Sequence, residues 1–177
     1  PLRARLTSLD EHDALLRLTE GGADLLLAWQ HPAMSLQLNP ARFESCLVAR
    51  DRLAPYTARG EAGVPRFPLV CRDESVPFLD HPADSYLGKL CEWLMQRADE
   101  APLLDLVCEA DTPEALRSMG AQGAGVAFLP GVLANEDARL VAASRDAAWE
   151  APLELYLWRE RVDVARRRPG AADALWN

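Results

Sequence analysis

Residues 111–130 read DTPEALRSMGAQGAGVAFLP, and this stretch holds the signals for a complete helix followed by a strand. Thr112 is a hydroxyl residue of the kind that caps helix N-termini, and Pro113 is favoured in the first helical turn. Gly123 is a common helix terminator. The apolar run 126–129 is too short for a helix and is typical of a buried strand. The stretch therefore predicts a helix packed beside a buried strand.

Similar patterns extend over the rest of the chain. Asp10 can cap a helix that Gly21 and Gly22 end. The apolar run 23–29 suits a strand covered on both faces, so that residues 3–29 form one βαβ unit. Alternating strands and helices predict an α/β fold with mainly parallel sheets. The other expected elements are strands at 3–8, 43–50, 67–71, 103–110, 139–142 and 152–159, helices at 11–20 and 85–97 and from Pro169, and loops around Pro55 and over 72–84.

The order of these strands allows two lobes joined by two crossings. A turn-rich, proline-containing linker occupies 31–40, and the last strand comes much later in the chain. We therefore expect lobe I to comprise residues 1–42 and 153–177, and lobe II residues 43–152. The chain starts at Pro1 without a methionine, so we expect it to be a fragment or a processed product.

Composition narrows the class of protein. The 177 residues are 49% hydrophobic and 26% charged, which is ordinary globular usage. No apolar run approaches the roughly 18 residues of a membrane helix, and no signal peptide opens the chain. The net charge of −8 argues against phosphate-backbone binding. A cluster of basic residues near the C-terminus indicates a solvent-exposed segment that leads into a helix rather than a nucleic-acid-binding patch. It comprises Arg159, Arg161, Arg166, Arg167 and Arg168.

The cysteines and histidines do not form a recognisable reactive centre. The spacing of Cys46, Cys71, Cys91 and Cys108 excludes a CxxC pair. Buried structural thiols in a reducing cytoplasm are the first interpretation, and a redox switch is the alternative.

Catalytic signatures are equally absent from the sequence. It lacks a P-loop, GxGxxG, GxSxG and HExxH. His12, His31 and His81 are scattered, and the last two precede prolines in turns, so we expect surface or loop positions. We expect no enzyme activity, no metal and no cofactor.

Four segments, in order, resemble a known family. Residues 111–130 resemble the helix–Gly–strand element of the effector-binding domain of LysR-type transcriptional regulators. Residues 15–28 resemble its "L-x-x-G-x-x-D-L" element, 43–53 the strand that enters the second lobe, and 153–160 the returning strand. The resemblance implies a two-lobed fold like type 2 periplasmic binding proteins, with a central cleft but without the usual first strand–helix unit.

The same resemblance implies a cytoplasmic homo-oligomer, a dimer or a tetramer, that responds to a small-molecule effector or an oxidant. DNA would be bound only through an N-terminal helix-turn-helix that this chain lacks, and no membrane would be involved. The motif Ser85-Tyr86-Leu87-Gly88-Lys89-Leu90, with Phe67-Pro68-Leu69 before it, is similar to the hypochlorite-responsive, HypT-like branch. Leu87 and Thr112 stand where that branch has methionines, which argues against a methionine switch at those positions.

The ligand contacts are expected at strand ends and helix N-termini, where α/β folds bind ligands. Ser85 and Tyr86 combine a loop, two hydroxyls and a helix start; the Tyr86 ring could instead pack and point its hydroxyl at water. Thr112 is equally well explained as a plain helix cap. The full set of expected ligand-binding residues is Thr7, Ser8, Gln30, His31, Ser85, Tyr86, Asp111 and Thr112.

Three functions remain open at the level of sequence. The first is the ligand-sensing domain of a LysR-type DNA-binding transcriptional regulator. The second is a sensor of hypochlorite or peroxide acting through Met or Cys oxidation. The third is a solute-binding protein of a transport system, which would share the fold.

Overall fold

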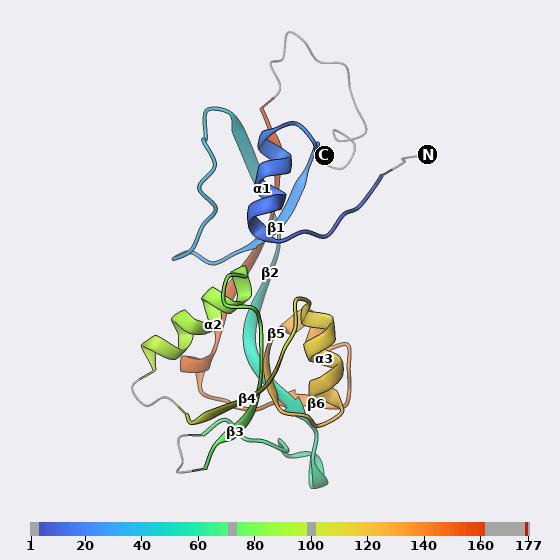
Figure 1. Ribbon diagram of the computed structural model, residues 1–177, viewed down its shortest axis with the longest axis vertical. Coiled ribbons are helices and arrows are strands. Elements are labelled where there is room, and N and C mark those ends of the chain that lie inside the picture. Colours follow the sequence, from blue (N-terminus) through green and yellow to red (C-terminus); the bar gives the residue numbers. More distant parts are fainter. Residues whose placement is uncertain (1–3, 71–73, 99–101, 162–175, 177) are drawn as a thin grey trace. The chain divides into compact units, whose positions relative to one another are not determined.

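The computed structural model describes residues 4–70, 74–98, 102–161 and 176. The chain divides into two compact units (Figure 1): unit 1 comprises residues 1–50 and 154–177, and unit 2 residues 51–153. The chain passes from one unit to the other inside two strands, β2 (Phe43–Ala58) and β7 (Ala151–Glu160). No helix in the described ranges is both long and apolar enough to cross a membrane.

Unit 1 is built on antiparallel pairing between strands from opposite ends of the chain. Strand β1 (Leu26–Gln30) pairs with β7, with Leu26 opposite Trp158 and Gln30 opposite Glu154. The helix α1 (Glu11–Thr19) precedes β1 and packs against it. Asp10 caps α1 by accepting a hydrogen bond from the Asp13 amide at 2.9 Å, as the sequence predicts.

Three expectations for unit 1 are wrong. The described part of the predicted 3–8 strand, from Ala4 onward, is irregular and exposed, and the Leu6 side chain is 96% exposed. The predicted βαβ unit therefore does not form, because β1 finds its partner in β7 and the pairing is antiparallel. Nor is β1 covered on both faces, since Leu27 is 53% exposed.

Unit 2 contains the remaining strands and helices. Its sheet has the order β2-β5-β3-β4, with β6 also paired to β2. Strand β3 is parallel to β4 and β5, whereas β2 is antiparallel to β5 and β6, so the sheet is mixed rather than mainly parallel. The elements are β3 (Val76–Asp80), α2 (Tyr86–Arg97), β4 (Leu104–Glu109), α3 (Pro113–Ala121), β5 (Val126–Pro130), α4 (Gly131–Ala134) and β6 (Leu140–Ala142), with 3-10 turns at Glu61–Gly63 and Ala147–Trp149.

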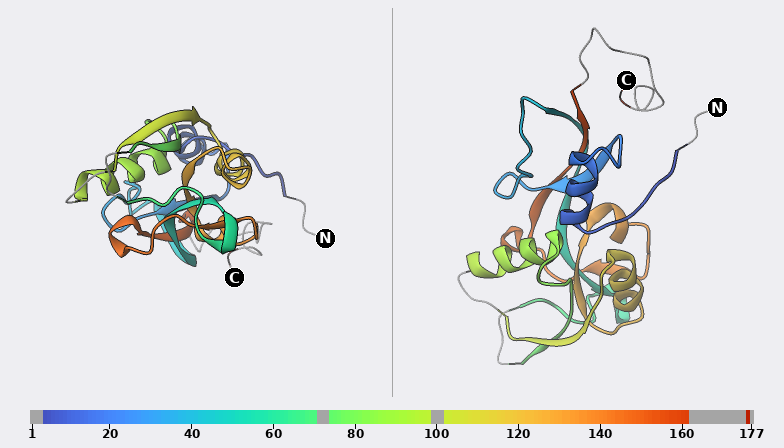
Figure 2. Two further views of the ribbon diagram at one scale, coloured as in Figure 1. Left: turned by 90° about the horizontal axis from the view of Figure 1, so that it is seen from below. Right: turned by 45° about the horizontal axis from the view of Figure 1, so that its top comes forward.

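The core of unit 2 lies where α3 packs against β3 and β5. All five residues of β5 are buried, and Leu79 and Leu116 have no exposed surface. Burying one leucine side chain contributes about 1.5–3 kcal/mol. A Cβ atom on Gly125 would lie 2.6 Å from the Pro77 carbonyl oxygen, so this close approach of two strands requires a glycine. Helices α2 and α3 lie apart in every view (Figure 2).

Several elements of unit 2 differ from the sequence prediction. Strand β2 continues through Pro55, where a loop was expected, and the Pro55 carbonyl accepts from the Ala143 amide at 2.8 Å. The described part of the predicted 67–71 strand is irregular. Strand β3 lies inside the predicted 72–84 loop, because pairing with β4 and β5 outweighs the local effect of Pro77.

The remaining predicted elements of unit 2 agree with the structure. Helices α2 and α3 and strands β4, β5 and β6 begin and end within two residues of their predicted bounds. Strand β7 is also confirmed. The helix predicted from Pro169 lies outside the described residues except for Trp176.

Candidate functional site

Two of the predicted ligand contacts are helix caps. The Ser85 hydroxyl oxygen accepts from the Gly88 amide at 3.0 Å and begins α2. The Thr112 hydroxyl oxygen accepts from the Ala115 amide at 3.3 Å and begins α3. A capping hydroxyl uses an acceptor lone pair, so its own hydrogen is still available to a ligand. Ser85 and the neighbouring Tyr86 are half-buried, whereas Asp111 and Thr112 are exposed.

The sheet brings these two helix starts to the same edge. Strands β3 and β4 are parallel, and Asp80 at the end of β3 is the register partner of Glu109 at the end of β4. The Ala110 amide donates a hydrogen bond to the Asp80 carbonyl at 3.1 Å, which holds the C-terminal ends of the two strands together. Positive helix N-termini at one sheet edge favour an anionic group there.

The buried His81 and the half-buried Asp80 form a polar pair at this edge that the sequence did not reveal. The His81 ring is 2% exposed, and its Nε2 donates to the Phe128 carbonyl at 2.8 Å. Burial lowers the pKa of His81, and the Phe128 contact partly opposes this. Burial also raises the pKa of Asp80, although its Oδ1 accepts from the His81 amide at 2.8 Å. The sequence signal His-Pro indicated only a turn.

Gln30 and His31 are both buried at the end of β1 in unit 1. Gln30 is 6% exposed, and among the described residues its Nε2 has no hydrogen-bond partner. His31 is 5% exposed, and its Nδ1 accepts from the Ala33 amide at 3.1 Å. His31 and His81 are therefore not surface residues, because a backbone contact compensates each ring for its lost hydration. Thr7 and Ser8 lie exposed in the segment before α1.

The thiols in the described ranges are unpaired and differ in burial. Cys91 lies on α2 and is buried, and burial raises the pKa of its thiol well above the usual value. Cys46 and Cys108 are half-buried free thiols. Cys71 lies outside the described residues. Within the described part of the chain, no group of three or more His, Cys, Asp or Glu side chains is placed to hold a metal ion.

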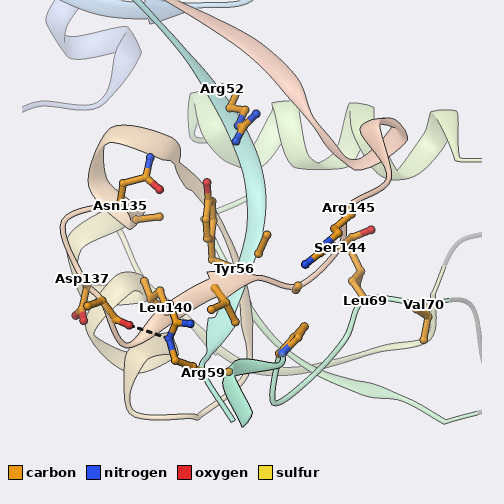
Figure 3. Close-up of a pocket in the computed structure, with 17 residues that line it drawn as sticks. Arg52, Tyr56, Arg59, Leu69, Val70, Asn135, Asp137, Leu140, Ser144 and Arg145 are labelled. Carbon is orange, nitrogen blue, oxygen red and sulfur yellow. Dashed lines mark hydrogen bonds between the residues drawn. The ribbon is translucent and has the colours of Figure 1, made fainter. Parts of the chain in front are cut away.

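A cavity of about 690 Å³ lies wholly within unit 2 (Figure 3). Its wall combines β2, β6, the end of α4 and the segment 63–70. Arg52 and Arg59 on β2 and its end, and Arg145 after β6, bring three guanidinium groups to the wall. None of the eight predicted ligand contacts lines it. The sequence could not reveal it, since its two main lining segments are about 80 residues apart.

Comparison with known families decides the identity of the fold. A sequence model described as "LysR substrate binding domain" matches residues 2–176. The chain belongs to this family. The LysR substrate-binding domain has a type 2 periplasmic-binding-protein-like α/β fold and is the effector-binding domain of LysR-type regulators, so the predicted family and fold class are confirmed. Family members and structural neighbours are transcriptional regulators rather than enzymes. No curated protein matches the chain in sequence.

Solved LysR regulators superpose on nearly the whole chain. The apo regulatory domain of HypT from Salmonella typhimurium is 25% identical, with a TM-score of 0.78 over 95% of this chain and 76% of that domain. Full-length HypT, a hypochlorite-specific LysR-type regulator, is 25% identical with a TM-score of 0.77, over 95% of this chain and 54% of that protein. DarR from Vibrio fischeri, solved with DNA, shares the fold at 24% identity, a TM-score of 0.78, and coverage of 96% and 55%. The chain thus spans about half of a full-length LysR regulator.

Proposed function

We propose that this LysR substrate-binding domain recognises a small-molecule effector and that Gln30 makes a decisive hydrogen bond to it. Effector binding shifts the chain between two conformations and so controls transcription through a DNA-binding part outside these residues. The full regulator acts in the cytoplasm as a homo-oligomer and carries out no catalysis.

The observation that carries this proposal is the unpaired amide of Gln30. A buried polar group without a partner costs about 1–3 kcal/mol. The Nε2 of Gln30 has less than 1 Å² of accessible surface and no acceptor among the described residues. A ligand acceptor such as a carboxylate or carbonyl oxygen would satisfy it, because an amide nitrogen donates two hydrogen bonds. His31 follows directly and is as deeply buried.

Polar groups in unit 2 support an anionic effector. The hydroxyls of Ser85 and Thr112 cap the two helices that follow β3 and β4 at one sheet edge. Each still has a hydroxyl hydrogen to donate, and each lies beside a positive helix end. Tyr86 and Asp111 flank these caps and complete the proposed contacts in this unit. Thr7 and Ser8, the remaining members of the set, precede α1.

The test separates binding from folding with a substitution that removes only the amide. A thermal-shift panel of organic acids, amino acids and sugar phosphates first identifies an effector. Gln30→Met keeps the side-chain length and removes the unpaired donor. We expect Gln30→Met to be as stable as the wild type, or about 1 kcal/mol more stable, while effector affinity falls about tenfold or more.

Trp158→Phe provides the matched control. The Trp158 Nε1 is also buried and unpaired among the described residues, and Trp158 lies opposite Leu26 on the same pair of strands. It is not one of the predicted ligand contacts, so we expect Trp158→Phe to retain full effector affinity. Equal affinity of Gln30→Met and wild type would contradict the proposal. A reporter gene driven by the full-length regulator would then show whether the loss reaches transcription.

Oxidant sensing is a second candidate function, favoured by the 25–26% identity to the hypochlorite-specific regulator HypT. The methionines available are Met34, Met95 and Met119. Leu87 and Thr112 stand where the HypT-like branch has methionines. All three methionines are half-buried, so oxidation would place a polar sulfoxide against packed surface. Mass spectrometry after mild hypochlorite or peroxide treatment should find stoichiometric oxidation of one of these methionines or of a cysteine. Absence of such oxidation excludes this route.

A further inference from the structure

We propose that the cavity of unit 2, walled by β2, β6 and residues 63–70, is a second ligand site that binds a small organic acid. We call it the β2–β6 cavity. It uses none of the residues assigned to the effector above. This second site is therefore independent of the proposed function and is tested separately from it.

The charge of the cavity wall differs in sign from that of the chain. The chain carries a net charge of −8. The wall nevertheless holds three arginines, Arg52, Arg59 and Arg145, against a single carboxylate, Asp137. Positive side chains concentrated in a concave surface of an acidic protein attract anions and repel cations.

Pairing within the protein leaves two of these positive charges uncompensated. Asp137 is held by Arg139, at 2.6 and 2.9 Å, and these hydrogen bonds lower its pKa to about 2. Arg52 lies 3.4 Å from Glu150. Arg59 donates from Nε to the Ala138 carbonyl at 3.1 Å, which orients the guanidinium without neutralising it. Arg145 makes no side-chain hydrogen bond or ion pair within the described ranges.

The rest of the wall can hold an apolar body and orient a polar head. Leu69, Leu140 and Val141 contribute apolar surface. The Tyr56 side chain is 6% exposed, and its ring stands in the wall with the hydroxyl directed towards Arg52 (Figure 3). The Asn135 amide also faces this wall and makes no side-chain hydrogen bond among the described residues. Uncommitted donors beside these apolar side chains suit a carboxylate attached to a small hydrocarbon body.

The size of the cavity agrees with a ligand of this class. Small-molecule pockets typically measure about 300–1,000 Å³ and combine apolar walls with a few placed polar groups. At about 690 Å³ the β2–β6 cavity is within this range. Arginine is the side chain best shaped for carboxylate, because its planar fork can donate two parallel hydrogen bonds.

Calorimetric titration of the 177-residue chain with phenylacetate and with its neutral analogue phenylacetamide tests the proposal. The two probes have the same aromatic body and differ in charge. We expect saturable binding of phenylacetate and at least about tenfold weaker binding of phenylacetamide, since a charge-assisted contact is worth about one factor of ten or more. Methyl signals of Leu140 and Val141 should shift on titration with phenylacetate.

Two arginine substitutions with equal change in net charge locate the site. Arg145→Gln removes the uncommitted guanidinium and should weaken phenylacetate binding about tenfold. Arg97→Gln is the matched control: Arg97 lies in the last turn of α2, stacks 4.6 Å from the Trp93 ring centroid, and does not line the cavity. It should leave the affinity unchanged. Arg145→Lys should restore part of the loss, because it restores the charge without the planar fork.

The opposite results overturn the proposal. Absence of saturable phenylacetate binding at millimolar concentration overturns it, as does equal binding of the acid and the amide. Unchanged affinity in Arg145→Gln also overturns it. A phenylacetate affinity that falls in Gln30→Met and not in Arg145→Gln would place the acid at the proposed effector contacts instead, which supports the proposed function and eliminates the second site.

Discussion

At the scale of single residues, the Asp80-His81 pair shows how burial sets protonation. The imidazole of His81 is almost fully enclosed, and the Phe128 carbonyl accepts a hydrogen bond from its Nε2. A charged imidazolium would gain little there, because desolvation outweighs the contact to the carbonyl and the nearby Asp80. His81 is consequently held neutral in the folded chain over a pH range in which it would be charged when unfolded.

This difference in the pKa of His81 predicts that acid lowers the stability of the folded chain. The unfolded chain takes up the His81 proton as the pH falls through about 6.5, whereas the folded chain does so only at a lower pH. Stability that is complete above pH 6.5 should therefore decline as the pH falls below it, by at most about 1.4 kcal/mol per pH unit from this residue. Urea unfolding between about pH 5 and 7.5 should show a shallower decline in His81→Gln, which keeps a donor but does not titrate.

The exposed His12 on α1 supplies the control, because His12→Gln makes the same histidine-to-glutamine exchange on the surface. Asp80 acts in the opposite direction at lower pH. Its folded pKa is raised above 3.8, so its contribution to stability grows as the pH falls through the folded value. A pH dependence that is identical in wild type and His81→Gln would contradict the assignment to His81.

At the scale of elements, the start of α2 is a close contact between helix and preceding turn. Gly88 is the third residue of α2, and the Ser85 hydroxyl accepts from its amide. A Cβ atom at Gly88 would lie 2.1 Å from the Pro82 carbonyl oxygen. The same carbonyl accepts from the Ser85 amide at 2.9 Å, so it cannot move away without breaking the turn. The helix can begin here only because residue 88 has no side chain.

Substituting Gly88→Ala should therefore destabilise the chain, although alanine is the better helix former. Overpacking of this kind costs about 1–3 kcal/mol. Gly120→Ala is the matched substitution in α3, where a new Cβ would meet only the Leu140 and Leu79 side chains at 3.7 and 3.9 Å. That variant should be neutral or more stable by up to about 1 kcal/mol. Urea denaturation of the two variants compares them directly, and equal effects would be inconsistent with the contact at Pro82.

The elements also show which features a sequence encodes locally. The caps Asp10 and Thr112 and the helix start at Ser85 were predictable, because each cap contacts a residue only three positions away. Strand β3 and the continuation of β2 through Pro55 were not, because both depend on partners distant in sequence. For the same reason, burial of His31 and His81 and the β2–β6 cavity could not be predicted, while the positions of the helix starts could.

At the scale of the whole molecule, the two units differ in how they use the chain. Unit 2 is one continuous segment, residues 51–153, and its β5-β3-β4 pairing, its β6 pairing and its core are internal to it. Unit 1 is assembled from two distant segments, because β1 finds its strand partner in residues 154–158 of β7. The connectivity therefore favours independent folding of unit 2 and not of unit 1.

Expression of residues 51–153 as a separate chain should yield a folded domain with a cooperative thermal transition, since its size is typical of autonomous domains. Residues 1–50 expressed alone should lack such a transition, because an isolated β1 has no partner strand. Circular dichroism and amide dispersion in NMR spectra distinguish the two outcomes. A non-cooperative 51–153 fragment would show that the core of unit 2 requires the flanking segments.

The buried thiol of Cys91 has a further use. Its sulfur is enclosed on α2 and held protonated, whereas Cys46 and Cys108 are partly accessible. A thiol reagent should thus modify Cys91 only in molecules whose helix α2 has transiently detached. The rate at which Cys91 is labelled therefore measures how often unit 2 opens locally. Modification of Cys91 therefore reports the local opening of unit 2 in the native chain, without an introduced cysteine.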